Sequence, residues 1–240
     1  MRRIIIALVA SALAISAVSA QTVIIDTFSN AQTNILRTTT GSTPVLQPDA
    51  SAVGGFRRVT NIYQSGSGNY DLIFNGSVMQ STADAGVLGS FLLQYGTQAQ
   101  LNINASATNA FQFERVFLDL ASGFTATITS GNGAVVATYT SPATAIPGGG
   151  APSQLVTVPF AAFTNGGLLN LADIDAVTLQ FDAAQPATQF QLDNIQFVSV
   201  AVPEPATVAL LGLAGAGVAS GWYLRRRRSQ QALNAKFSRI

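Results

Sequence analysis

Carboxylates are the strongest acid–base side chains that this sequence offers, because it contains no histidine and no cysteine. A Ser-His-Asp triad, a histidine-ligated zinc site and disulfides are therefore excluded. Two carboxylates that face each other across a cleft can hydrolyse a glycoside. Asp84, Asp173, Asp175 and Asp182 are the residues available for such a pair. Acidic residues in loops and on outward strand faces usually interact only with water, so we expect no enzyme.

The charge of the middle of the chain differs from that of the whole. Residues 21–200 contain ten acidic residues and four arginines, a net charge of −6, although the complete chain carries +1. Because this segment has no basic stripe, we expect no nucleic-acid partner. Arg57 and Arg58 are neighbours, and neighbouring strand residues point to opposite faces. One of them can pair with a buried Asp while the other is exposed; a ligand-binding role is the alternative.

Short runs of alternating apolar residues, separated by Gly- and Asn-rich turns, predict strands in residues 21–200. In the segment from Val177 to Asp182 the apolar side chains fall on one face and the polar ones on the other. The expected strands are residues 22–28, 56–63, 70–74, 87–95, 111–120, 124–130, 135–140, 154–158, 176–182 and 189–198. This spacing predicts an all-β fold, a jelly-roll-like two-sheet sandwich.

Two of these strands change the face on which their apolar residues lie. The change falls at Glu114-Arg115 in one strand and near Asp193-Asn194 in the other. A β-bulge at each position would restore a single buried face. The alternative is a central strand with both faces partly buried.

The first twenty residues have the three-part layout of a secretory signal peptide. Arg2 and Arg3 form a positive start, residues 4–18 are apolar or small, and Val18-Ser19-Ala20 places small residues before a cleavage site. We expect signal peptidase to cut between Ala20 and Gln21. A retained membrane anchor is the alternative, although the apolar run is shorter than the roughly 20 residues of a span.

Residues 206–224 carry no charge and are long enough for a transmembrane helix. Arg225, Arg226, Arg227 and Arg228 follow at once and, by the positive-inside rule, remain in the cytoplasm. The expected topology exports residues 21–205 and leaves 229–240 as a cytoplasmic tail.

Pro203-Glu204-Pro205 precedes the span, and two prolines around one residue keep the backbone extended. An extended peptide just outside a membrane is a substrate that a processing protease can grip. The combination of Val-Pro-Glu-Pro, a Gly/Ala-rich span and an arginine cluster resembles the PEP-CTERM sorting signal of exopolysaccharide-producing Gram-negative bacteria. The resemblance covers about residues 202–228 of an expected sorting signal at 201–228, and it implies that an exosortase removes the tail.

The stretches VTVPFAAF, LNLADIDAVTLQFDA and FQLDNIQF resemble the C-terminal half of galactose-binding-like jelly rolls, which occur in many carbohydrate-binding modules. The resemblance implies a structural calcium ion between the first and last strands, at Asp26 and Asp193, because carboxylate oxygens suit Ca²⁺. Otherwise Asp193 caps a bulge and Asp26 is a solvated strand residue. No cofactor is required.

Flat aromatic rings usually form the binding platform for a polysaccharide on a sandwich. The single tryptophan, Trp222, lies in the C-terminal tail. The remaining candidates are Tyr63, Tyr70, Tyr95 and Tyr139.

The sequence predicts an exported, non-enzymatic protein that is anchored in the inner membrane before exosortase processing. Afterwards it belongs to the cell surface or extracellular matrix of a Gram-negative bacterium and is associated with exopolysaccharide or biofilm. The alternatives are a carbohydrate-binding adhesin, a carboxylate-based glycoside hydrolase and a plain single-pass membrane protein.

Overall fold

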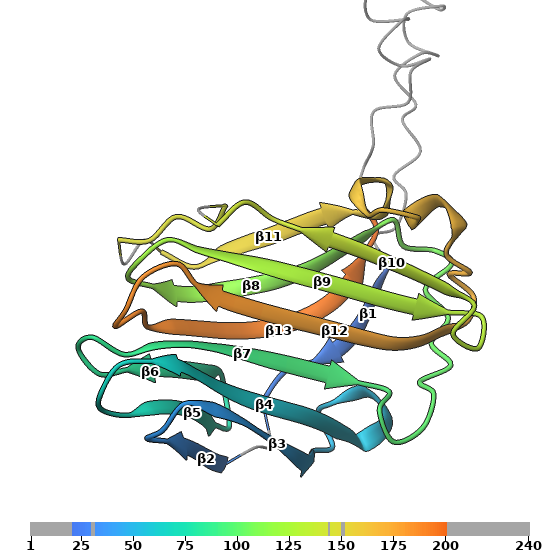
Figure 1. Ribbon diagram of the computed structural model, residues 1–240. Coiled ribbons are helices and arrows are strands. Elements are labelled where there is room, and N and C mark those ends of the chain that lie inside the picture. Colours follow the sequence, from blue (N-terminus) through green and yellow to red (C-terminus); the bar gives the residue numbers. More distant parts are fainter. Residues whose placement is uncertain (1–20, 30–31, 144, 150–151, 201–240) are drawn as a thin grey trace, which may run out of the picture. The chain divides into compact units, whose positions relative to one another are not determined.

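Two antiparallel β-sheets packed face to face make up the fold (Figure 1). The structure is a computed structural model that describes residues 21–29, 32–143, 145–149 and 152–200. The predicted signal peptide, the Pro203-Glu204-Pro205 motif, the span at 206–224 and the arginine cluster lie outside the described residues. No helix among the residues that the structure describes is long and apolar enough to cross a membrane.

The first sheet has seven strands in the order β11-β8-β13-β6-β5-β2, with β1 paired to β13. These strands are β1 (Thr22–Asp26), β2 (Gln32–Arg37), β5 (Tyr70–Asn75), β6 (Met79–Ala83), β8 (Ala110–Leu118), β11 (Gln154–Pro159) and β13 (Phe190–Val198). β8 follows one edge of β13, while β6 and β1 share the other edge, β6 at residues 190–192 and β1 at residues 195–198. The last strand therefore holds the sheet together.

The second sheet has six strands in the order β10-β9-β12-β7-β4-β3. They are β3 (Gly41–Pro48), β4 (Phe56–Ser65), β7 (Leu88–Tyr95), β9 (Ser122–Ser130), β10 (Val135–Thr140) and β12 (Ile174–Ala183). β12 lies between β9 and β7, and both of these strands come much earlier in the sequence. Such crossovers between two sheets confirm the predicted jelly-roll-like sandwich.

All ten predicted strands are present, and three further strands, β2, β3 and β6, were not predicted. β3 is an edge strand with only one buried residue, Gln47, and it contains Pro44 and Pro48. β2 is also an edge strand, and β6 is only five residues long. β3 is mostly exposed, β2 buries Ile35 between exposed residues, and the buried positions of β6 are Met79 and the polar Ser81. None of the three therefore shows the apolar alternation that marks a strand in a sequence.

The change of face in β8 and β13 is caused by irregular pairing, so the bulge interpretation is the correct one. The register between these strands shifts between Gln191 and Leu192 and again between Asp193 and Gln196. Asn194 adopts a left-handed backbone conformation with φ 47° at the second shift. The irregularity in β8 falls at Val116, just after the predicted position, because Arg115 and Phe117 pair with consecutive residues of β13.

The core between the sheets is rich in phenylalanine. The ring of Phe181 on β12 lies 4.9 Å from that of Phe91 and 4.4 Å from that of Phe190, measured between centroids. Phe113 and Phe124 pack against it at 5.3 and 6.0 Å. Burying each such side chain contributes about 1.5–3 kcal/mol, so this cluster joins β7, β8, β9, β12 and β13 into one core.

Both outer strands of the six-stranded sheet have features that limit further strand pairing. Pro44 and Pro48 of β3 are an even number of residues apart, so their missing N–H groups fall on the same side of the strand. On β10, Thr138 exchanges two backbone hydrogen bonds with Thr164. The side-chain amide of Asn165 donates to the carbonyl of Val136.

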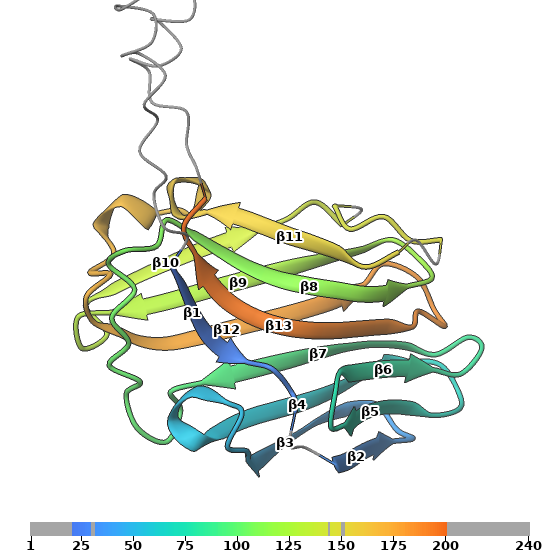
Figure 2. The ribbon, with the colours of Figure 1, turned by 180° about the vertical axis from the view of Figure 1, so that it is seen from behind.

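The two ends of the described chain lie at the same end of the sandwich, as the neighbouring strands β1 and β13 show in Figure 2. Thr22 pairs with Val198, and the N–H of Ser199 donates to the carbonyl of Gln21 at 3.0 Å. We call this end of the sandwich, with Gln21, Ser199 and Val200, the terminal pole.

Candidate functional site

Arg57 is fully buried, although a guanidinium group always carries its charge in proteins. Its side chain belongs to the inward row of β4, together with Val59, Asn61 and Tyr63, all of which are also buried. A buried charge is tolerated only when it is paired and hydrogen-bonded. The neighbours of Arg57 therefore show what this site is built to do.

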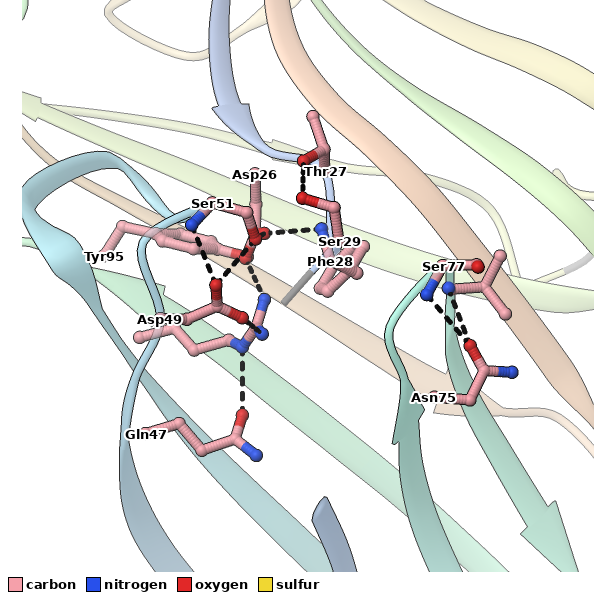
Figure 3. Close-up of polar contacts among 12 residues, drawn as sticks. Asp26, Thr27, Phe28, Ser29, Gln47, Asp49, Ser51, Asn75, Ser77 and Tyr95 are labelled. Atoms are coloured by element: carbon pink, nitrogen blue, oxygen red, sulfur yellow. Dashed lines mark hydrogen bonds and ion pairs between the residues drawn. The ribbon is translucent and has the colours of Figure 1, made fainter. Parts of the chain in front are cut away.

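Two carboxylates and one amide bind the guanidinium (Figure 3). Nη1 of Arg57 pairs with Asp26, and Nη2 pairs with Asp49. Nε donates to Oε1 of Gln47, its register partner on β3, at 2.9 Å. The expectation that one of the two neighbouring arginines pairs with a buried Asp is confirmed for Arg57.

A bulge in β1 turns Asp26 toward the arginine. Ile25 and Asp26 are consecutive and both fully buried, and the register of β1 against β13 shifts at this point. Asp26 is therefore not the solvated residue that we considered. Asp49 follows β3 in a tight turn, where its Oδ1 accepts hydrogen bonds from the N–H and the hydroxyl of Ser51, both at 2.8 Å.

Aromatic rings complete the surroundings of Arg57. The rings of Phe28 and Phe74 lie 4.8 and 4.7 Å from the guanidinium carbon, within the range of a cation–π interaction. The hydroxyl of Tyr95 donates to Oδ2 of Asp26 at 2.8 Å. Burial raises the pKa of Tyr95 well above its ordinary value, and the negative charge of Asp26 raises it further. The tyrosine therefore remains a neutral donor.

This group of residues connects the two sheets. Asp26 and Phe74 belong to the seven-stranded sheet, whereas Arg57 and Tyr95 belong to the six-stranded sheet. All of them are buried, so no substrate reaches them from solvent. The arrangement pairs every charged group with a neighbour and stabilises the contact between the sheets.

The predicted calcium ligands lie in different surroundings. Both oxygens of Asp26 already accept hydrogen bonds. Oδ1 accepts from the N–H of Phe28 and the hydroxyl of Ser51, and Oδ2 accepts from Arg57 and the hydroxyl of Tyr95. Asp193 is the register partner of Glu114, and the side chain of Asn194 donates to both carboxylates. Burial raises the pKa of Asp193, and the charges of Glu114 and Asp26 add to the effect.

No group of three or more acidic, histidine or cysteine side chains is placed to hold a metal ion among the described residues. Structural calcium at Asp26 and Asp193 stays a prediction. Calcium binding there would require Asp26 to give up its ion pair with Arg57 and bind the ion instead.

The predicted tyrosine platform is wrong for three of its four residues. Tyr63, Tyr70 and Tyr95 are buried in the core, because each lies on the inward face of its strand. Burial raises the pKa of Tyr70 far above its ordinary value. Tyr139 is partly buried and packs against Phe124 and Phe163. None of the four stands free as a flat ring on the surface.

The carboxylates considered for hydrolysis are engaged in local contacts. Asp175 accepts a hydrogen bond from the N–H of Gly133, Asp84 from that of Asn69, and Asp182 from the amide of Gln180. Asp175 and Asp182 stand seven residues apart on β12, roughly 23 Å along the strand, whereas paired glycosidase carboxylates lie about 5–9.5 Å apart. Asp173 belongs to the turn before β12, and its carbonyl accepts from Gly131.

An open pocket of about 120 Å³ lies where β4 begins and β7 ends. Phe56 is 43% exposed there and contributes an aromatic ring, while Thr97, Gln98 and Gln100 contribute polar groups. The remaining lining residues are Val53, Gly54, Gly96, Ala99 and Leu101. We did not predict this pocket, although Phe56 after two glycines and the polar run after Gly96 are visible in the sequence.

The outer face of the six-stranded sheet carries a polar row. Thr127, Thr178, Gln94 and Arg58 are successive register partners across β9, β12, β7 and β4. Their side chains are half-buried, so the row offers hydroxyl, amide and guanidinium groups on a continuous surface. It is the second place where a polar ligand can bind.

The tail of the chain matches a known sorting signal. Residues 201–228 match the PEP-CTERM protein-sorting motif. This match confirms the resemblance seen in the sequence and implies an exported protein that is membrane-anchored before exosortase processing and surface-associated. No curated protein sequence matches the chain.

Solved structures with a similar chain path include sugar-binding and adhesin domains. A family 11 carbohydrate-binding module from Clostridium thermocellum, in complex with a β-1,3-1,4-mixed-linked tetrasaccharide, has 16% identity and a TM-score of 0.40, with 75% of this chain and 96% of the module covered. A family 29 carbohydrate-binding module from Piromyces equi has 9% identity and a TM-score of 0.34, with 78% and 95% covered.

The K1 cleaved adhesin domain of Lys-gingipain from Porphyromonas gingivalis W83 has 15% identity and a TM-score of 0.32, with 76% and 99% covered. At such scores these likenesses carry no argument about a ligand. The assignment of the fold rests on the order of the strands.

Removing the guanidinium should destabilise the sandwich severely. In Arg57→Ala two buried carboxylates lose their counter-charge, which costs about 3–5 kcal/mol of unfolding free energy. Arg58→Ala is the matched control, because Arg58 points to the outer face, and it should change stability by only about 0.5 kcal/mol. Urea unfolding of the full chain in detergent measures both. Equal losses in the two variants would show that the buried ion pairs are not what stabilises the fold.

Asp193→Asn should raise the melting temperature at pH 7 in EDTA. The folded pKa of Asp193 lies above its unfolded value, so its stability contribution is complete below the unfolded pKa of about 3.9 and is lost as pH rises through the folded pKa. The gain should therefore vanish near pH 3. Thermal unfolding with added CaCl₂ tests the calcium prediction, which requires the ion to stabilise the wild type and not the variant.

Proposed function

We propose that the protein is an exported, exosortase-sorted and non-enzymatic component of the cell surface or extracellular matrix of a Gram-negative bacterium, associated with exopolysaccharide. The observation that carries the proposal is the match of residues 201–228 to the PEP-CTERM sorting motif. The sequence before it supports the same route, because a signal-peptide pattern opens the chain and an arginine cluster follows the apolar segment.

The residue types of the chain and the spacing of its carboxylates support a binding or structural role rather than catalysis. The chain has no histidine and no cysteine, and the acidic residues at opposite ends of β12 are too far apart to act as a pair. Sandwiches of this kind also host unrelated functions, so the fold alone does not select one. We include in the proposal that residues 21–200, the exported domain, are a galactose-binding-like jelly roll, on the resemblance of their C-terminal half to that family.

The proposal predicts two masses for the mature protein, depending on the host. With an exosortase present, the chain should begin at Gln21 and end near Pro205. Without the enzyme it should still end at Ile240. Intact mass spectrometry of protein from both strains measures this directly. A chain that ends at Ile240 in both strains would leave a plain single-pass membrane protein instead.

A carbohydrate-binding adhesin is the second candidate, and the pocket at Phe56 is the observation that favours it. An exposed aromatic ring beside amide and hydroxyl groups can stack on a sugar ring and bind its hydroxyls. The acidic surface of residues 21–200 favours a neutral glycan over an anionic one, because like charges repel.

Retention of the protein on gels containing neutral glucans or galactans tests the second candidate. Phe56→Ala should reduce retention about fivefold or more if the ring contributes roughly 1–3 kcal/mol, as stacking contacts on aromatic side chains do. Leu155→Ala, which removes another exposed apolar side chain, 56% exposed on β11, should leave retention unchanged. Loss of retention in Gln94→Ala but not in Phe56→Ala would place binding on the polar row and exclude the pocket.

A further inference from the structure

The side chain of Asn109 holds the last described residue of the chain. Its Nδ2 donates to the carbonyl of Val200 at 2.7 Å, and its Oδ1 accepts from the N–H of Val200 at 2.8 Å. The amide thus pairs with the backbone of Val200 through two hydrogen bonds, as a neighbouring strand would. We call this pair of bonds the Asn109 clamp.

The backbone of Asn109 is also engaged, so the clamp stands on a fixed base. Its N–H donates to the carbonyl of Val198 at 3.0 Å, and its carbonyl accepts from the N–H of Phe160 at 2.9 Å. Ser199 lies between Val198 and Val200, and its N–H donates to the carbonyl of Gln21, which precedes β1. The chain beyond β13 is therefore held from two sides at the terminal pole.

The sorting motif begins directly after the clamp. The match to the motif starts at residue 201, so no spacer separates it from Val200. Only Ala201 and Val202 stand between Val200 and Pro203. The three steps from Val200 to Pro203 span at most about 11 Å, so a processing enzyme that binds Pro203-Glu204-Pro205 must approach Val200 closely.

We infer that Asn109 is a positioning residue for tail processing: the clamp restricts access to the sorting motif, and the exosortase acts on the state in which the clamp is open. Proteolysis of a transiently opened segment follows the equilibrium population of the open form when opening is fast. The Asn109 clamp consists of two hydrogen bonds near the surface, so it opens without unfolding the core. This inference rests on the proposed sorting function.

The rate of tail removal in cells that contain an exosortase tests the inference, by pulse-chase labelling and intact mass. Asn109→Ala should shorten the half-time of conversion, by about fivefold to thirtyfold for two hydrogen bonds of ordinary strength. Insertion of Gly-Ser-Gly between Val200 and Ala201 should also shorten it, because the enzyme gains room. Asn109→Ala added to the insertion should then have little further effect.

Two control variants separate the clamp from general instability. Asn34→Ala makes the same chemical change on exposed β2 and should process at the wild-type rate. Ser141→Ala removes a buried side-chain hydrogen bond to Phe124 in the other sheet, so it lowers stability without touching Val200. Melting temperatures of the full-length chains in detergent rank the variants by stability.

An unchanged or longer half-time in Asn109→Ala, with the wild type processed, would overturn the inference and leave the sorting function intact. The same holds if Ser141→Ala accelerates processing as much as Asn109→Ala at equal stability. A wild type that keeps Ile240 in the presence of the exosortase would overturn the sorting function, and the inference with it.

Discussion

The buried guanidinium of Arg57 is the interaction on which the arrangement of the two sheets depends. It extends from the six-stranded sheet and binds Asp26 of β1, a five-residue strand that pairs only with β13 among the described strands. Without it, Asp26 and Asp49 would be carboxylates with no counter-charge in the core, a state that proteins avoid at a cost of several kcal/mol. In a chain without cysteines, this ionic contact links distant segments as a disulfide would elsewhere.

The same interaction determines where the chain enters and leaves the sandwich. β1 must pair with β13 for Asp26 to reach Arg57, and this pairing brings Gln21 beside Ser199. The terminal pole is thus a consequence of a charge neutralised deep in the core. Stability and the position of Val200, the last described residue, are therefore coupled through one short strand.

The sequence was sufficient for the architecture but only partly for the site. The alternation of apolar residues predicts the buried strands, because burial on one face imposes a period of two. It fails for β3, where Pro44 and the lack of burial remove the signal. The sequence predicts that one of the two neighbouring arginines pairs with a buried Asp. Which Asp residues bind Arg57 depends on the bulge at Asp26 and the turn at Asp49. Tyr95 was misplaced because an amphipathic ring fits the core when its hydroxyl finds an acceptor, here Asp26. Phe56 was missed because alternation alone does not distinguish a core phenylalanine from one at a pocket.

The edges of the six-stranded sheet affect how readily one molecule can pair with another. Open edges offer rows of N–H and C=O groups to neighbouring chains and are the usual starting point of cross-β assembly. Pro44 and Pro48 remove two donors from β3, and the segment around Thr164 occupies the matching groups of β10. Both edges of the six-stranded sheet are thereby less favourable for strand addition. Where molecules crowd together, these two edges therefore disfavour the strand-to-strand contacts from which fibres grow.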